Sequence, residues 1–219
     1  ALTDPDGLLA VGGDLTSKRL LAAYQQGIFP WYSEGQPILW WSPSTRATID
    51  PNHVHISRSM TRLLRQDKFE ITVNLGFTQV IAACAAERQQ SGTWITPEMQ
   101  QAYIHLHQLG HAHSIEVWQA ERLVGGIYGV NIGQLFCGES MFHREPNASK
   151  VAFIALCQHF AQHGGQLLDA QVPNPHLTSL GVTSQPRALF LATAKVLTAA
   201  PIGTRCWTKQ SIHLIQKSF

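Results

Sequence analysis

Residues 127–171 read IYGVNIGQLFCGESMFHREPNASKVAFIALCQHFAQHGGQLLDAQ, and this stretch decides the fold. Two segments with alternating apolar side chains meet at Asn131-Ile132-Gly133, which predicts an antiparallel hairpin. Asn147 is typical of a helix N-cap, and apolar residues then recur at helical spacing as far as Gly164-Gly165. Residues 167–172 are largely apolar and predict a further strand, so the stretch supplies a hairpin, a helix and a returning strand.

Three polar side chains interrupt the apolar strands of this stretch. Glu139 follows the break at Gly138 and has apolar neighbours, among which a carboxylate needs a partner. Asp169 and Gln171 are two positions apart on the last predicted strand, so alternation places them on one face. We therefore expect these three side chains to share one cleft and to form a site.

Helix caps and breakers predict the elements that precede this stretch. The predicted helices cover residues 16–26, 57–66, 77–88 and 96–109, and the predicted strands cover residues 69–74 and 112–118. Three antiparallel strands followed by a helix and a returning strand predict the α+β class, with a mixed sheet flanked by helices, and this order resembles the N-acetyltransferase-like fold. Residues 1–45, rich in glycine and aromatic residues, predict a small N-terminal α/β domain, and residues 46–219 form the larger domain.

Composition limits the possible functions of the 219-residue chain. Charged residues make up 14% and the net charge is only +2, so a nucleic-acid partner would have to bind a local basic cluster. The four cysteines form no CxxC pair, which favours reduced thiols in a cytoplasmic protein over a disulfide or zinc framework. No apolar run is long enough for a membrane span, and we expect a monomer without membrane contact.

A cluster of four histidines is a possible metal site. His105 and His107 fall two apart on a predicted helix and therefore point apart, whereas His111 and His113 could share a strand face. No spaced acidic or cysteine partner accompanies them, so we predict no metal site. Ser140 lacks a nucleophile-elbow motif, and the cysteines lack the context of a thiol enzyme.

Basic and aromatic residues each allow two interpretations. Arg58, Arg62 and Arg65 fall on one face of a predicted helix, where they could bind phosphates or simply face solvent. Aromatic residues gather in loop-like sequence and could stack on a nucleobase, although such rings are more often part of a core. The residues in this aromatic group are Tyr24, Phe29, Trp31, Tyr32, Trp40, Trp41 and Trp94.

A series of short motifs resembles one known family. In order, they are GGDL, YQQGIFPWY, LWWSP, HISRSM, GTWIT, LHQLGHAHSIEVW, LVGGIYGV, LFCGESMF, NASK and DAQ. Together they are similar to the bacterial leucyl/phenylalanyl-tRNA-protein transferases over nearly the whole chain. The resemblance implies transfer of leucine, phenylalanine and, less readily, methionine from aminoacyl-tRNA to proteins that begin with arginine or lysine. It also implies that the product is an N-degron, which marks the protein for degradation.

The resemblance assigns roles to particular residues. Trp31 and Trp94, helped by Tyr24 and Tyr103, would contact the terminal adenosine of the tRNA, and Arg58 and Arg62 would hold the acceptor stem. The aminoacyl side chain would occupy a pocket of Ile127, Phe136, Met141 and Leu168, with Ile127 standing where the family usually has methionine. Glu139, Asp169 and Gln171 would form the catalytic centre, without a metal or cofactor.

The implied chemistry is aminolysis of an ester that is already activated. The enzyme needs mainly to align an uncharged amine with the carbonyl, accept a proton and stabilise the oxyanion. Gln171 could orient either group, Asp169 could polarise Gln171 or bind the cationic acceptor, and Glu139 could pair with an ammonium or guanidinium group. Water or a tRNA hydroxyl could also accept the proton.

Two alternatives from other classes remain at this point. The first is a tRNA-binding module without transfer activity, although such a module has no need for Glu139, Asp169 and Gln171 on apolar strands. The second is an acetyl-CoA enzyme, but residues 144–148 read REPNA where that fold normally has a glycine-rich pyrophosphate loop.

Overall fold

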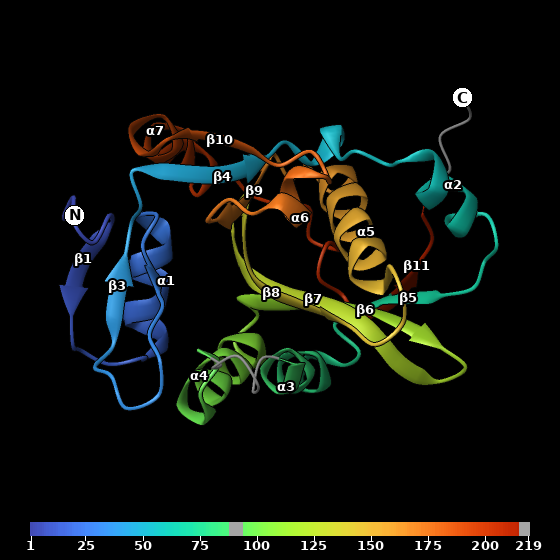
Figure 1. The fold of residues 1–219 in the computed structure, drawn as a ribbon, viewed down its shortest axis with the longest axis horizontal. Coiled ribbons are helices and arrows are strands. Elements are labelled where there is room, and N and C mark those ends of the chain that lie inside the picture. Colours follow the sequence, from blue (N-terminus) through green and yellow to red (C-terminus); the bar gives the residue numbers. More distant parts are fainter. Residues whose placement is uncertain (88–93, 215–219) are drawn as a thin grey trace.

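The computed structural model describes residues 1–87 and 94–214, and Figure 1 shows the path of the chain. The helices are α1 (Ser17–Gln25), α2 (Arg58–Leu64), α3 (Phe77–Glu87), α4 (Pro97–Gln108), α5 (Ala148–Gln162), α6 (Pro175–Thr178) and α7 (Arg187–Leu197), with a 3-10 turn η1 (Pro51–His53). The strands are β1 (Leu8–Val11), β2 (Phe29–Pro30), β3 (Leu39–Trp41), β4 (Thr45–Ile49), β5 (Glu70–Val73), β6 (Ala112–Gln119), β7 (Arg122–Ile132), β8 (Leu135–His143), β9 (Leu167–Gln171), β10 (Thr183–Pro186) and β11 (Gln210–Ile212).

The strands form two sheets. The small N-terminal sheet has the order β1-β3-β2, and the large sheet has the order β10-β4-β9-β8-β7-β6-β5-β11. Within the described residues, β8 and β9 form the parallel pair of the large sheet, because α5 carries the chain back to the edge where β8 began. The other recorded pairings in this sheet are antiparallel, so the sheet is mixed.

Helices cover both faces of the large sheet. Figure 1 shows α5 on one face and α3 with α4 on the other, while α1 and the small sheet lie beside β4 and β9. Two apolar cores result, and the one on the α3 and α4 side also includes α1 and Phe190 of α7. The second core lies between the sheet and α5. The N-terminal unit therefore packs on the large sheet through a continuous core.

Glycine allows α5 to pack closely on β7. A Cβ atom on Gly125 would lie 2.6 Å from the Cβ of Ala148, the first residue of α5, which is closer than real Cβ contacts. This close approach accounts for a glycine in the middle of a sheet strand. It also fixes where α5 begins relative to the hairpin that carries Glu139.

The predicted α+β class, with a mixed sheet flanked by helices, is confirmed. The order of three antiparallel strands, a helix and a returning strand is observed as β6, β7, β8, α5 and β9. The helix predicted to start at Ser57 is shorter than expected, ending at Leu64, and Arg88 lies outside the described residues. The predicted boundary at residue 45 stays a prediction.

Some local predictions need correction in detail. Asn147 is the N-cap of α5, as predicted, but its side chain makes no capping hydrogen bond, and its backbone has a φ of 69°, a left-handed conformation that asparagine tolerates. Segments expected as loops contain the short strands β1, β2 and β3.

None of the helices in the described part of the chain is long and apolar enough to cross a membrane.

Candidate active site

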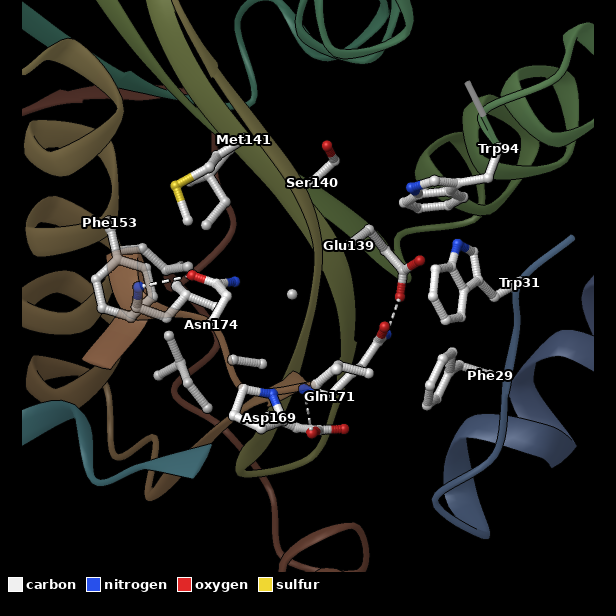
Figure 2. Close-up of a pocket in the computed structure, with 18 of the residues that line it drawn as sticks. Phe29, Trp31, Trp94, Glu139, Ser140, Met141, Phe153, Asp169, Gln171 and Asn174 are labelled. Carbon is white, nitrogen blue, oxygen red and sulfur yellow. Dashed lines mark hydrogen bonds between the residues drawn. The ribbon is translucent and has the colours of Figure 1, made fainter. Parts of the chain in front are cut away.

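A cavity of about 290 Å³ opens between the N-terminal unit, the middle of β8 and the end of β9. Its lining residues are Phe29, Pro30, Trp31, Trp94, Ile127, Gly138, Glu139, Ser140, Met141, Phe153, Leu156, Leu168, Asp169, Ala170, Gln171, Val172, Pro173, Asn174 and Leu177. Figure 2 shows Trp31, Trp94 and Phe29 at one end, Met141 and Phe153 at the other, and Glu139 with Gln171 between them. The cavity thus has an aromatic end, a polar centre and an apolar end.

A β-bulge places Glu139 in the polar centre. Tyr128 pairs with Ser140 and Gly129 pairs with Gly138, so Glu139 is the extra residue on β8. A bulge redirects a side chain without ending the strand, and bulges are frequent beside active sites. The Glu139 carboxylate is consequently directed to the side of the sheet on which α1 and α4 pack, where two tyrosines meet it.

Three donors contact the buried Glu139 carboxylate. The Tyr24 hydroxyl lies 2.7 Å from Oε1, the Tyr103 hydroxyl 3.1 Å from Oε2, and Nε2 of Gln171 2.8 Å from Oε1. Burial raises the pKa of Glu139 to about 7, although these hydrogen bonds act in the opposite direction. Glu139 therefore exchanges a proton close to neutral pH, as a general acid or base must.

The two tyrosine hydroxyls also contact each other, which limits how the protons can be arranged. Two hydroxyl protons must serve three oxygen contacts: one between the hydroxyls and one from each hydroxyl to Glu139. When Glu139 is ionised, one of these contacts lacks a proton. A proton arriving on Glu139 completes the set, so the network is built to accept one.

Asp169 is paired with a buried arginine. Nε of Arg46 lies 2.7 Å from Oδ1 of Asp169 and Nη2 lies 2.5 Å from Oδ2, and both side chains are almost completely buried. Nη1 of Arg46 donates to the carbonyl of Gly27 at 2.9 Å, and the guanidinium lies between the rings of Phe29 and Phe190. Because both Asp169 oxygens bind Arg46, this carboxylate is unsuited to binding a cationic acceptor.

Gln171 connects this ion pair to Glu139. Its backbone N–H donates to Oδ1 of Asp169 at 2.9 Å, while its side-chain amide donates to Glu139. The residue has a φ of 63°, which a non-glycine residue adopts only when its surroundings impose it. Asp169 thus acts on the Gln171 backbone, whereas the expected polarisation of the side chain by Asp169 is not what the hydrogen bonds show.

The apolar end contains three of the four predicted pocket residues. Ile127, Met141 and Leu168 line the cavity. Phe136 is not among the described lining residues. It lies nearer the start of β8, where its ring packs on Phe160 and Trp207 at centroid distances of 6.0 and 5.4 Å. Phe153, Leu156 and Leu177 complete the apolar wall, and helical spacing alone did not distinguish them from core residues.

The predicted tRNA-contacting aromatics occupy two different environments. Trp31 is 45% exposed and Trp94 is half-buried, and both line the aromatic end of the cavity. Tyr24 and Tyr103 are completely buried, so their rings offer no surface for a nucleobase, and their hydroxyls hold Glu139 instead. The assignment of Trp31 and Trp94 to the terminal adenosine stays a prediction.

The basic helix lies apart from the cavity. Arg58 and Arg62 are exposed on α2, which Figure 1 places on the far side of α5 from the N-terminal unit. Neither arginine lines the cavity or forms an ion pair with another described residue. Any contact they make with tRNA must therefore be remote from the aminoacyl ester.

The other sequence candidates have structural partners. His113 is buried, its Nδ1 lies 3.1 Å from Nδ2 of Asn74, and its ring stacks on Trp207, so it does not form a ligand pair with His111. All four cysteines are buried as thiols, and burial raises the pKa of Cys137 far above its usual value. A buried, protonated thiol is a poor nucleophile.

Arg46 is the important site residue that the sequence interpretation missed. It occupies β4, a five-residue strand in which only Ala47 and Ile49 are apolar, so the sequence carries no periodic signal that this arginine is buried. A charged side chain at such a position requires an opposite charge nearby. Asp169, the carboxylate on another apolar strand, was the matching partner.

Known proteins resemble this chain over most of its length. Residues 48–195 match the family described as leucyl/phenylalanyl-tRNA protein transferase, and residues 13–44 match the N-terminal domain of the same description. A leucyl/phenylalanyl-tRNA–protein transferase from Yersinia pestis is 55% identical over 97% of this chain and 90% of the relative. A transferase of the same name from Yersinia pseudotuberculosis has the same identity and coverage.

One of the similar solved structures is a GCN5-related N-acetyltransferase-like protein from Streptococcus suis. It is 16% identical, the match covers 81% of this chain and 61% of that protein, and the TM-score is 0.32.

Proposed function

This chain belongs to the leucyl/phenylalanyl-tRNA–protein transferase family, and from that premise we propose that the cavity between Trp31 and Phe153 is where the aminoacyl ester is attacked. The protein is an aminoacyltransferase that acts on aminoacyl-tRNA and protein substrates. Relatives named as transferases at 55% identity do not support the alternatives of a binding module or an acetyl-CoA enzyme.

The shape of the cavity supports one orientation of the donor. The terminal adenosine stacks at the aromatic end on Trp31 and Trp94, and the leucyl or phenylalanyl side chain enters the apolar end beside Met141 and Phe153. The ester carbonyl then lies in the polar centre, next to Gln171 and Glu139. Binding both ends of the donor in this way aligns the carbonyl for attack, which supplies much of the catalysis in an aminolysis.

Glu139 is the proton acceptor in this proposal. The acceptor binds with a neutral α-amine, and its nitrogen passes one proton to the ionised Glu139 carboxylate as it attacks the ester carbon. The new amide C–N bond forms as the ester C–O bond breaks, and Glu139 delivers the proton taken from the amine to the leaving ribose oxygen, directly or through water, so that the carboxylate is ionised again. The hydrogen-bond network around Glu139, which lacks one proton when the carboxylate is ionised, is the observation that carries this assignment.

Gln171 and Asp169 position the reacting groups. Arg46 neutralises Asp169, Asp169 holds the Gln171 backbone, and Gln171 directs its amide toward the same carboxylate that receives the proton. The amide of Gln171 can also orient the ester carbonyl. Asp169 is therefore a positioning residue in this proposal.

The finer substrate assignments rest on the family resemblance. We infer that leucine, phenylalanine and, less readily, methionine are transferred to proteins that begin with arginine or lysine, and that the product is an N-degron. Four buried cysteine thiols favour the reducing cytoplasm as the place of reaction. The direct test is incubation with labelled leucyl-tRNA and an arginine-starting peptide, without CoA or ATP. Label should appear in that peptide and not in an alanine-starting peptide; failure with both would contradict the proposal.

We expect Arg58→Ala combined with Arg62→Ala to weaken tRNA binding. Each lost phosphate contact removes a counterion-release term, so the slope of log affinity against log salt should flatten by roughly 0.7 to 0.9 per arginine. The apparent KM for leucyl-tRNA should rise more than turnover at saturation falls, because α2 lies apart from the cavity. The control is Arg122→Ala, which removes an exposed arginine from β7. An unchanged salt slope in the double variant would mean that Arg58 and Arg62 face solvent and do not contact tRNA phosphates.

We expect isoleucyl- and valyl-tRNA to be poor donors. Branching at Cβ stiffens and widens the side chain beside the reacting carbonyl, so kcat/KM should fall by roughly 10- to 200-fold relative to leucyl-tRNA. Met141→Ala enlarges the apolar end and should narrow this difference. Single-turnover transfer from each charged tRNA to one peptide measures the difference in rate between the donors. Equal rates for leucyl- and isoleucyl-tRNA would contradict the pocket assignment.

A further inference from the structure

A second cluster of chemically active side chains lies outside the cavity. His159 is in the last turn of α5, His163 caps the end of that helix, and Cys206 lies in the segment before β11. One ligand atom from each of the three lies within 4.8 Å of the other two. None of them lines the active-site cavity or takes part in the proposed reaction.

The hydrogen bonds of both histidines leave one ring nitrogen of each available to a metal. Nε2 of His159 lies 2.6 Å from the carbonyl oxygen of Cys206, and Nδ1 of His163 lies 2.8 Å from the carbonyl oxygen of His159. A carbonyl can only accept, so these nitrogens carry protons, and the other nitrogen of each ring keeps its lone pair. Metal-binding histidines in proteins are held by this kind of bond to a backbone carbonyl.

The three side chains lie close to one another in a part of the protein where His159 and Cys206 are buried. The rings of His159 and His163 lie close together, with centroids 4.4 Å apart. Two imidazoles and a thiol suit a borderline-soft cation, and a bound cation displaces the thiol proton.

We propose that His159, His163 and Cys206 bind one zinc ion, with a water molecule as fourth ligand. In tetrahedral zinc sites with Zn–N bonds of about 2.0 Å and Zn–S bonds of about 2.3 Å, ligand atoms lie roughly 3.3 to 3.6 Å apart. The present separations of up to 4.8 Å must therefore shrink by about 1 Å when the ion enters. Cys206 is on a connecting segment, which can make this adjustment more easily than α5 can.

Zinc at this site would fasten the C-terminal segment to α5. The segment already touches the end of α5, because the Gly203 N–H donates to the His163 carbonyl and the Cys206 N–H donates to the Gly203 carbonyl. Trp207 follows directly, stacking on His113 and packing on Phe136. The ion would thus hold in place, against α5, the residues that lead from α7 to the edge strand β11.

The test uses untagged, reduced full-length protein. After equilibration with zinc and desalting, elemental analysis should find about one zinc per chain. Titration of the zinc-free protein with cobalt(II) should produce a thiolate-to-cobalt charge-transfer band, together with the visible bands of tetrahedral cobalt. Zinc at 100 times its Kd should raise Tm by at least about 5 °C, because it binds the folded state.

Cys206→Ala and His163→Gln should each abolish the cobalt bands and the zinc-dependent rise in Tm. The matched controls are Cys157→Ala and His105→Gln. The first removes a buried thiol that lies in α5 and outside the cluster, and the second removes an exposed histidine. Both controls should still bind one zinc. Zinc below about 0.1 per chain in the parent protein, or cobalt bands that persist in Cys206→Ala, would overturn the proposal.

Discussion

Glu139→Gln is expected to lower turnover by roughly 100-fold or more, because a positioned general base contributes about 10²- to 10⁴-fold. Glutamine preserves the size of the side chain and can still contact Tyr24, Tyr103 and Gln171, but it cannot take the proton of the attacking amine. Binding of leucyl-tRNA should change little, since Trp31, Trp94 and the apolar wall remain.

The pH profile separates this role from a structural one. In the parent protein the acceptor amine, with a pKa of about 7.7 to 8.0, and Glu139, whose pKa is raised to about 7, must both lose a proton before reaction. The logarithm of kcat/KM for the peptide should therefore rise with a slope of about two below pH 7 and about one between pH 7 and 8. In Glu139→Gln only the amine titrates, so the slope should be about one throughout.

Tyr103→Phe provides the matched control. It removes one hydrogen bond that favours the ionised carboxylate, so the pKa of Glu139 should rise and the acid side of the profile should move to higher pH, with the slope of two retained. Circular dichroism and leucyl-tRNA binding check that each variant is folded. If Glu139→Gln keeps full turnover and the parent's profile, the proton goes to another acceptor.

Arg46→Met is expected to cost about 3 to 5 kcal/mol of unfolding free energy, because it leaves the buried Asp169 carboxylate without a compensating charge. The Phe29 and Phe190 rings that enclose the guanidinium cannot compensate that charge. Urea unfolding measures the loss. Arg19→Met, which breaks the exposed ion pair with Asp14, should change stability little by comparison.

A double variant distinguishes stability from positioning. Arg46→Met combined with Asp169→Leu removes both charges, so it should recover much of the stability that Arg46→Met loses. Its activity should stay low, because the Gln171 N–H no longer has Asp169 to hold it. Equal destabilisation by Arg46→Met and Arg19→Met would contradict the larger contribution to stability that we assign to the buried ion pair of Arg46 and Asp169.

Local patterns in the sequence predict the central part of the fold and much less of its edges. The segments that became β6, β7, β8 and α5 are long, periodic and bounded by glycine or asparagine, and Gly164-Gly165 marks the break before the shorter β9, so short-range signals suffice. The strands β4, β10 and β11 are short and are defined by partners far along the chain. Such strands carry no periodic signal of their own.

The same division applies to the site. Glu139, Asp169 and Gln171 could be selected because polar residues on apolar strands are conspicuous. Their partners could not: the bulge that redirects Glu139 appears only when β8 is paired with β7, and Arg46 meets Asp169 only across the β4–β9 pairing. The cluster of His159, His163 and Cys206 was missed for the same reason, since Cys206 joins the pair only through tertiary structure.

The Arg46 guanidinium also connects two parts of the cavity wall. Arg46 binds the Gly27 carbonyl just before β2, which leads to Trp31, and it binds Asp169 two residues before Gln171. In an aminoacyl-tRNA the covalent bonds between the last base and the ester carbonyl limit the distance that separates them. If the donor binds as proposed, one rigid, planar group sets the spacing between the base-stacking surface and the reaction centre, and we therefore expect the protein to select donors by length as well as by side chain.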